Sequence, residues 1–426
     1  MRRQAYPQLG EELYSATLAN GLRLRIVPKQ GFARSYAFLA VDFGAIDTAF
    51  TLDGRKQRVP DGIAHYLEHK MFDLPEGNAM ELFAAHGGSP NAFTGYDMTA
   101  YYFSGTEEFE ENLKLLLRMV ITPYFTDESV EKERGIIAQE IRMYDDSAAS
   151  RVGEELFRAQ FGRHPIRVPI AGTVESIGEI TAQMLYDCHA AFYQPANMSL
   201  CLVTDADPAA LCALVEAALP AAAAALPQRD YGEKEPMRPV TAEHTMQMCV
   251  SMPTFSVGFK CEPPQKGMQT MCREIIGDLA AELLAGESSP LYVRLYDEGL
   301  IDSDFSGDYE GVKDACLLSF SGDSCDPQAV YAAILEEAKR LNAEGFDQAL
   351  FDRLKKSALG RRMRDLDSFE SICYRICAYE FDAVEYFRFP EAYACVTAQE
   401  VREFLQTAVQ PERAAISVIY PQKEQS

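Results

Sequence analysis

Basic residues are scarce in this chain of 426 residues. It has 40 lysines and arginines against 64 aspartates and glutamates, so its net charge is 40 − 64 = −24. A protein that binds the phosphate backbone of a nucleic acid needs the opposite balance. The sequence also lacks any apolar run near the roughly 18 residues that a membrane span requires. We therefore expect neither a nucleic acid nor a membrane as a partner.

Cysteine is missing from the first 187 positions, and the 11 cysteines that follow contain no CxxC pair. An odd number of thiols without paired spacing is typical of a reduced protein whose cysteines pack as small hydrophobic side chains. Cys373 and Cys377 share a helical face, which leaves a metal site open as an alternative to packing. The N-terminal segment 'MRRQAYPQLGEELY' has no apolar stretch of the secretory type. These absences predict a cytoplasmic protein.

The length and the 47% apolar content are sufficient for two cores. A segment rich in alanine and proline near the middle predicts a first domain over 1–222, a linker over 223–243 and a second domain over 244–426. The halves resemble distant copies, because 'FSG' occurs at 103–105 and again at 320–322, each time between a strand-like run and an amphipathic helix.

Strand-length apolar runs such as 'GLRLRIVP' and 'YAFLAVDFGA' alternate with helical patterns in each half. Neighbouring strands can pair without obligatory crossovers, and no Gly-rich phosphate loop follows a strand. We therefore predict an α+β fold made of two tandem homologous domains, each a mostly antiparallel sheet covered by helices.

The stretch 'GIAHYLEHKMF', residues 62–72, follows Asp61, which is expected to cap a helix that starts there. On this helix His65 and His69 lie one turn apart, with Glu68 on nearly the same face. Two imidazoles in this register can bind one zinc ion and leave the carboxylate beside the remaining coordination position. A chance occurrence of HxxEH is on the order of one in a hundred for so few histidines, so a third ligand is the discriminating feature.

A second helix, predicted over 127–146, offers that ligand. Its Glu133 and Glu140 are two turns apart on one face, and Glu140 is flanked by isoleucines at three nearby positions. A carboxylate beside such an apolar stripe requires a counter-charge, which zinc would supply.

Together, 'GIAHYLEHKMF', 'GGSPNAFTGYDMTAYYF' and 'EKERGIIAQEI' resemble the inverzincin metallopeptidases of the insulinase, pitrilysin and mitochondrial processing peptidase family. The resemblance covers the first half and continues into the second as a general pattern. The length is similar to that of short bacterial members that work as paired subunits. The resemblance implies a zinc-dependent endopeptidase that cleaves peptides or leader segments inside a closed chamber.

The resemblance also implies the role of each residue. His65 and His69 are the imidazole ligands of one Zn²⁺ per chain, Glu140 is the third ligand, and Glu68 is the general base toward the attacking water. Glu133 orients a ligand or the substrate, with a solvated helix carboxylate as its alternative. The separation of 140 − 69 = 71 positions is slightly shorter than is usual in the family.

Substrate contacts are implied in both halves. In the family the strand that contains Asn91, Ala92 and Phe93 pairs with the extended peptide, although pattern alone fits an ordinary sheet edge equally well. Arg294, in 'LYVRLYDEGLIDSDFS', matches an arginine that reaches the substrate. The tyrosine expected after it is replaced by Asp302.

The second half lacks the metal ligands. Its comparable helix 'GDLAAELLAG', at 277–286, has no histidine, and Arg361 falls opposite Glu140. We expect this half to form a chamber wall and the chain to pair as a homodimer or as a heterodimer with a motif-less homologue, which Asp302 favours. A small S-ribosylhomocysteine-cleaving enzyme would need a cysteine ligand that the first half does not contain. The other alternative is a non-catalytic scaffold or processing subunit of the same fold.

Overall fold

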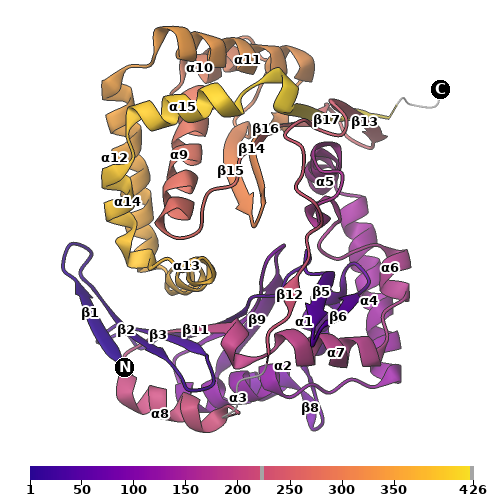
Figure 1. Cartoon of the computed structure of the whole chain (residues 1–426), viewed down its shortest axis with the longest axis vertical. Helices are drawn as coiled ribbons and strands as arrows, with labels where there is room; N and C mark the ends of the chain where they lie inside the picture. The colour runs from indigo at the N-terminus through magenta and orange to yellow at the C-terminus, as the bar shows by residue number, and fades with distance from the viewer. Residues whose placement is uncertain (221–224, 423–426) are drawn as a thin grey trace. The chain divides into compact units, whose positions relative to one another are not determined.

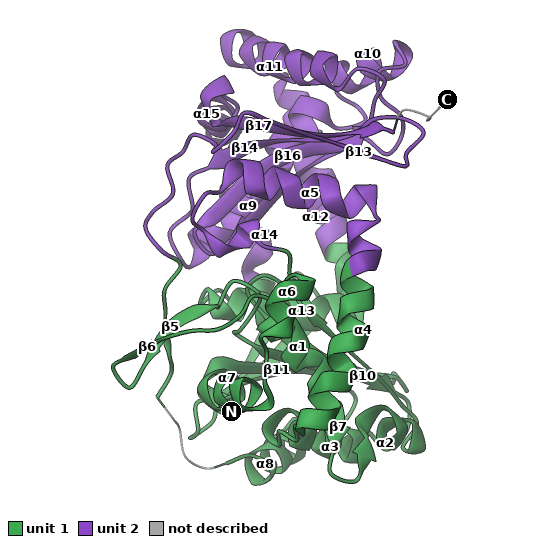
Figure 2. Ribbon diagram, turned by 90° about the vertical axis from the view of Figure 1, so that its right-hand side faces the viewer, with its two compact units in different colours: residues 1–141, 169–231, 363–387 green, residues 142–168, 232–362, 388–426 purple. Residues whose placement is uncertain are grey.

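The structure is a computed structural model that describes residues 1–220 and 225–422. These residues form two compact units (Figure 2). Unit 1 comprises residues 1–141, 169–231 and 363–387, and unit 2 comprises residues 142–168, 232–362 and 388–426. Each half of the chain thus lends a segment to the unit built mainly from the other half. Residues 221–222 of the predicted first domain, residues 223–224 of the predicted linker and residues 423–426 of the predicted second domain lie outside the described part of the chain.

Unit 1 is built on a seven-stranded sheet with the order β1-β2-β3-β11-β4-β10-β9. Every neighbouring pair is antiparallel except β3 and β11. The strands are β1 (Arg2–Tyr6), β2 (Glu11–Thr17), β3 (Arg23–Pro28), β4 (Ser35–Val41), β9 (Gly88–Thr94), β10 (Thr99–Gly105) and β11 (Met198–Thr204). Smaller sheets join β12 (Gln228–Arg229), β5 (Ala49–Leu52) and β6 (Arg55–Arg58), and β7 (Asp73–Leu74) with β8 (Gly77–Asn78).

Helices cover both faces of this sheet. They are α1 (Ile63–Lys70), α2 (Ala79–Ala85), α3 (Phe109–Ile121), most of α4 (Asp127–Asp145), α6 (Val174–Gly178), α7 (Ala182–Phe192), α8 (Pro208–Ala218) and α13 (Phe369–Phe381). In β4, Leu39 faces the large core shared with the N-terminal helices, whereas Phe38 faces α13. Because both faces are covered, all seven residues of β4 are buried. This explains why its sequence is a continuous apolar run and not an alternating one.

Unit 2 has a five-stranded sheet with the order β13-β17-β14-β16-β15. Its strands are β13 (Glu243–Met248), β14 (Thr254–Cys261), β15 (Ser306–Val312), β16 (Ala315–Asp323) and β17 (Ala414–Pro421). Its helices are α5 (Ala148–Gln160), α9 (Met268–Ala285), α10 (Pro290–Asp297), α11 (Pro327–Glu344), α12 (Gln348–Arg364), α14 (Phe389–Cys395) and α15 (Ala398–Ala408) (Figure 1).

The N-terminal half contributes α5 to unit 2, where Leu156 and Ala159 form an apolar cluster with Leu317 and Ala415 of the sheet. A side chain at Gly258 would bring a Cβ atom to 2.9 Å from Leu156 Cδ2, so this glycine permits the close approach of α5. In exchange, the C-terminal half contributes α13 to unit 1. Cys373 and Cys377 are buried there, and their thiols lie 3.6 Å from backbone carbonyls of β11, as expected of packed cysteines.

The duplication predicted from the sequence is visible in the topology. The series β3-β11-β4-β10-β9 and β13-β17-β14-β16-β15 have the same order, and in each only the first pair is parallel. The repeated 'FSG' lies in the equivalent strands β10 and β16, where Phe103 is opposite Ala37 and Phe320 is opposite Val257. The predicted α+β fold with two homologous, mostly antiparallel domains is confirmed. None of the helices in the described residues is long and apolar enough to cross a membrane.

Candidate metal centre and catalytic site

The HxxEH segment forms helix α1 at the centre of unit 1. The helix begins at Ile63 and is preceded by Gly62, which has a φ of 87° and makes no side-chain cap. The N-cap position is therefore held by Gly62 and not, as predicted, by Asp61. Glycine is needed at position 62 for two reasons. Its φ is positive, and a Cβ atom there would lie 2.4 Å from the carbonyl oxygen of Ala171.

Apolar residues of α1 anchor it in the core, and two of its polar residues, His65 and Glu68, are buried as well. His65 is 9% exposed and Glu68 is 8% exposed. The hydroxyl of Tyr66 donates a hydrogen bond to the carbonyl of Val130 in α4. This contact ties α1 to the helix that carries the two glutamates singled out by the sequence.

The three residues that the resemblance implied as metal ligands lie close together. Nε2 of His65 lies 3.7 Å from Oε1 of Glu140, and Nε2 of His69 lies 3.5 Å from Oε2 of the same residue. One ligand atom from each of the three residues lies within 4.8 Å of the others. The two helices thus bring together side chains that are 71 positions apart in the chain, since 140 − 69 = 71.

This donor set fits zinc. Two imidazole nitrogens and a carboxylate oxygen are among its usual ligands, and bond lengths of about 2.0–2.2 Å in a tetrahedral site place ligand atoms about 3.3–3.6 Å apart. The separations of 3.5 and 3.7 Å between the imidazole and carboxylate atoms are close to this range. Three protein ligands would leave one position for water or substrate, as in catalytic zinc sites.

Glu133 contacts the His69 ring on the nitrogen that does not face Glu140. Nδ1 of His69 is 2.9 Å from Oε1 of Glu133. Burial lowers the pKa of His69, but the hydrogen bonds with Glu133 and Glu140 outweigh burial and raise that pKa to about 10. The hydrogen bond from His69 in turn lowers the pKa of Glu133. The alternative that Glu133 is a solvated helix carboxylate does not fit this contact.

The pKa values of His65 and Glu68 are shifted mainly by burial. Desolvation, with the charge of His69, lowers the pKa of His65 to about 4, so this imidazole is neutral near pH 7. Desolvation also raises the pKa of Glu68, partly offset by a hydrogen bond from Thr94. The Thr94 hydroxyl donates to Oε2 of Glu68 at 2.8 Å. A carboxyl group with a raised pKa beside a metal site suits proton transfer near neutral pH.

The predicted substrate residues lie on β9, at the edge of the sheet, where β9 pairs with β10. Alternation along the strand divides them between its faces. Ala92 packs against the core on the side of α1, as Thr94 does, whereas the ring of Phe93 lies 6.1 Å from that of Phe38 on the opposite face. Asn91 is turned back on its own strand, and its Oδ1 accepts a hydrogen bond from the amide of Ala92.

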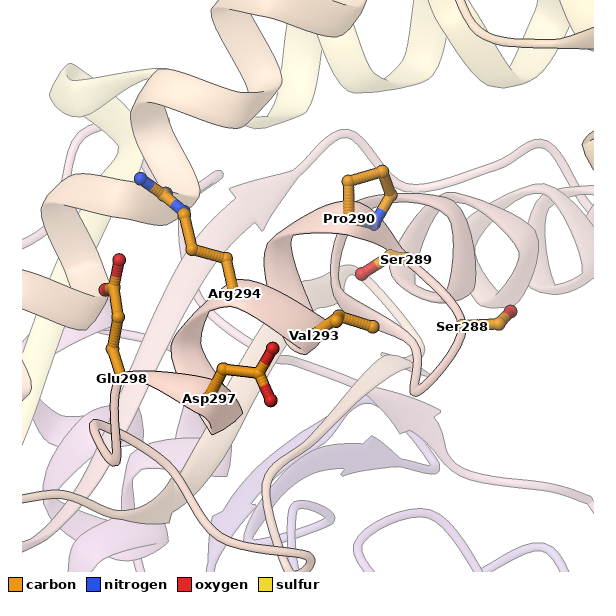
Figure 3. A pocket seen from close by; sticks show the side chains of 7 residues that line it. All are labelled: Ser288, Ser289, Pro290, Val293, Arg294, Asp297 and Glu298. Carbon is orange, nitrogen blue, oxygen red and sulfur yellow. The ribbon is translucent and has the colours of Figure 1, made fainter.

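Arg294 belongs to unit 2. It lies in α10 beside a pocket of about 570 Å³ (Figure 3). Its side chain and that of Glu298 lie on the same side of the helix. The remaining lining residues are Ser288, Ser289, Pro290, Val293 and Asp297. The role of Arg294 toward a substrate bound in unit 1 stays a prediction.

An ion pair occupies the corresponding place in unit 2. Arg361 of α12, which the sequence aligns with Glu140, has its Nη2 atom 2.8 Å from Oε1 of Glu282 in α9. Arg362 makes a similar contact with Glu274 of the same helix. Arginine cannot coordinate a metal, so α9 and α12 are joined by charge pairs where α1 and α4 present a metal donor set.

Two features of the site were not anticipated from the sequence. Thr94 lies three residues after Asn91, and strand alternation from Ala92 would have placed it on the face of α1. The second is a series of contacts that leads from Arg229 to the turn after β9. Nε of Arg229 lies 3.0 Å from Oδ1 of Asp47, and Oδ2 of Asp47 accepts a hydrogen bond from the amide of Gly44. The amide of Ala45, the residue after Gly44, donates to the carbonyl of Gly95 in the turn. No local pattern links residues so far apart in sequence.

A helix bearing HxxEH, completed by a glutamate from a second helix on a duplicated α+β fold, defines the inverzincin class of metallopeptidases. Comparison with known proteins agrees. Residues 56–174 match the family described as Insulinase (Peptidase family M16), and residues 179–358 match the Peptidase M16 inactive domain. The chain belongs to peptidase family M16.

Some individual relatives match nearly the whole chain. It is 35% identical to a protein of Bacillus subtilis described as uncharacterized zinc protease YmfH, over 98% of both chains. The crystal structure of a putative M16-like peptidase from Alicyclobacillus acidocaldarius superposes with a TM-score of 0.93 at 33% identity, covering 98% of this chain and 100% of the other. Pitrilysin, with a TM-score of 0.76 at 20% identity, shares the fold over 99% of this chain and 45% of its own. Relatives named as zinc proteases support zinc as the metal and a peptidase role.

Proposed function

We propose that this protein is a zinc-dependent endopeptidase that holds one Zn²⁺ per chain. The convergence of His65, His69 and Glu140 beside the buried carboxyl group of Glu68 carries this proposal. Zinc, when bound, supplies a Lewis acid that polarises the scissile carbonyl and acidifies water. The remaining chemistry belongs to the side chains of the protein.

Glu68 acts as the general base. Its carboxylate takes a proton from the attacking water and delivers that proton to the leaving amine, so its protonation state is restored after each turnover. The raised pKa of this buried group makes both halves of the transfer accessible near neutral pH. Glu133 is proposed to orient His69 through the hydrogen bond between them.

The peptide binds in an extended conformation along β9. The outer edge of this strand can form backbone hydrogen bonds with it, as in β-augmentation. Asn91, Ala92 and Phe93 are the proposed contacts, and Arg294 is proposed to reach the substrate from unit 2. The deficit of basic residues, which gives a net charge of −24, favours peptides that carry positive charge.

Unit 2 is proposed to form part of a chamber wall, because ion pairs stand where unit 1 has its metal ligands. A second subunit, identical or a motif-less homologue, would complete the chamber. The alternative is a non-catalytic scaffold or processing subunit of the same fold, in keeping with the match of residues 179–358 to a domain described as inactive. Retention of the HxxEH residues favours the enzyme.

Metal analysis combined with peptide cleavage tests the proposal. Purified protein is loaded with zinc and incubated with a library of internally quenched peptides, alone and with a homologous chain that lacks the motif. We expect Glu68→Gln to retain zinc and to lower kcat by about 10²–10⁴-fold. Cleavage by this variant near the rate of the wild-type protein would remove Glu68 as the base. Wild-type protein that binds no zinc and cleaves nothing in either setting would favour the scaffold.

A further inference from the structure

Thr94 connects the strand at the edge of the sheet to the proposed base. It is the last residue of β9, and its hydroxyl donates to Oε2 of Glu68 at 2.8 Å. Among the described residues it is the one recorded as donating a hydrogen bond to this carboxylate. A glutamate side chain has three rotatable bonds, so a single fixed donor strongly restricts where its oxygens lie.

The position of Thr94 is itself well determined. It pairs with Thr99 across the hairpin of β9 and β10, and the amide of Gly95 donates to the carbonyl of Met98 at 2.8 Å to close the turn. The carbonyl of Gly95 accepts from the amide of Ala45 at 3.0 Å. These contacts fix the backbone of Thr94, and its branched Cβ restricts rotation about χ1, so the position of its hydroxyl is confined.

We propose that Thr94 is a positioning residue that aligns Glu68 with a peptide bound on β9. This inference rests on the proposed function, because it assigns Thr94 a role through the base. Thr94 and Ala92 lie on the same face of one strand, so the hydrogen bond sets the carboxylate at a fixed distance from the backbone along which the peptide pairs. Misplacing a catalytic group by about 1 Å can lower the rate by about 10²-fold.

The test compares three threonine variants as zinc-loaded full-length proteins on a quenched peptide that the wild-type protein cleaves. Thr94→Val removes the hydroxyl at nearly constant volume, and we expect it to lower kcat about 10- to 100-fold with KM changed less than about threefold. Thr94→Ser restores the donor and should return kcat to within about threefold of the wild-type value. Thr99→Val is the matched control, because its hydroxyl donates to the carbonyl of Phe43 at 2.8 Å and not to the base.

Two outcomes would overturn the inference. One is a Thr94→Val variant with an unchanged kcat, or with a raised KM alone, which would reduce Thr94 to a part of the strand. The other is a Thr94→Ser variant as slow as Thr94→Val. Crystal structures of the zinc-loaded proteins give a readout independent of activity: the Glu68 carboxylate should leave its position in Thr94→Val and keep it in Thr94→Ser. An unmoved carboxylate in Thr94→Val contradicts the inference even if no substrate is found.

The failure of this inference is distinguishable from that of the proposed function. If Glu68→Gln is inactive while Thr94→Val is fully active, only the role of Thr94 is wrong. If Glu68→Gln is active, the base is another group and the proposed function itself must change. In the Glu68→Gln background, adding Thr94→Val should lower kcat less than about threefold further, because residues that act as a unit are not additive.

Discussion

Nδ1 of His69 lies 2.9 Å from Oε1 of Glu133, while Nε2 of the same ring lies 3.5 Å from Oε2 of Glu140. The His69 ring thus lies between two carboxylates. Glu133 orients the ring, and Glu140 would bind the same metal ion as the ring. In the neutral ring, a proton held on Nδ1 by Glu133 leaves the lone pair on Nε2, where the other ligands converge. Because the pKa of His69 is raised to about 10 in the metal-free protein, zinc binding has to displace the second proton from Nε2. This arrangement gives Glu133 a physical role in metal affinity.

We therefore expect Glu133→Ala to weaken zinc binding about 10- to 100-fold, because the ring loses the acceptor that fixes its orientation. Glu133→Gln should lose less, since its amide oxygen still accepts the hydrogen bond. Competition with a chromogenic chelator measures both affinities. Glu131→Ala is the control on the same helix, because Glu131 is 69% exposed and pairs with Arg134. Equal zinc affinity in Glu133→Ala and Glu131→Ala would show that Glu133 is dispensable.

The metal content of the chain should depend on Glu140 and not on its counterpart in unit 2. Glu140→Ala leaves two imidazoles, which are too few for a stable zinc site, so zinc should be lost on dialysis while the wild-type protein retains about one ion per chain. Arg361→Ala should keep the full zinc content. The pair of Arg361 with Glu282 is 52% and 34% exposed, so its loss should cost about 0–1 kcal/mol of stability. Atomic absorption measures the zinc content of both variants. Full zinc retention by Glu140→Ala would exclude Glu140 as a ligand.

Gly62→Ala should destabilise the protein more than the same change at Gly54. Both glycines have positive φ, 87° and 74°, for which a side chain costs about 1–2 kcal/mol. At Gly62 the added Cβ atom would also lie 2.4 Å from a backbone oxygen, whereas nothing lies within 4 Å at Gly54. Chemical denaturation of both variants measures the difference, and Gly62→Ala should additionally weaken zinc binding because α1 starts there. Equal denaturation midpoints would contradict the close approach seen at Gly62.

The buried His189 should make the metal-free protein less stable in acid. Its Nε2 donates to the carbonyl of Val120 at 2.9 Å, and desolvation lowers its pKa from 6.5 to about 4. Between pH 6.5 and pH 4 the unfolded chain binds a proton at this residue that the folded chain does not, so stability falls as the pH falls through this window. The contribution of His189 to the free energy of unfolding is fully present above pH 6.5, and its loss at lower pH amounts to at most about 3 kcal/mol.

His189→Gln can keep a donor to Val120 but does not titrate. We expect its unfolding free energy to fall less steeply than that of the wild-type protein from pH 6.5 to pH 4, when urea denaturation is followed at several pH values. Other buried histidines contribute equally to both proteins, so the difference isolates this residue. Parallel pH dependences in the two proteins would mean that His189 does not titrate as its burial requires.

Much of the fold was accessible from the sequence because its signals are local. Apolar runs of strand length, amphipathic helices and the repeated 'FSG' depend only on neighbouring residues, and they predicted the duplicated α+β architecture that the topology confirms. The start of α1 was predicted to within one residue, but its cap was not, because the close approach of Gly62 to Ala171 joins residues that are remote in sequence. The exchange of α5 and α13 between the units also has no local signal, since an amphipathic helix does not specify which sheet it covers.

The sequence by itself determined the chemistry of the candidate site. Helical periodicity puts His65, Glu68 and His69 on one face whatever surrounds the helix, and it does the same for Glu133 and Glu140. Only the tertiary structure decided that the two helices meet, that Glu133 bonds to His69, and that Thr94 bonds to Glu68. These contacts join residues from 26 to 75 positions apart, since 94 − 68 = 26 and 140 − 65 = 75. Such separations are set by the packing of the core around α1, which periodicity within one element cannot encode.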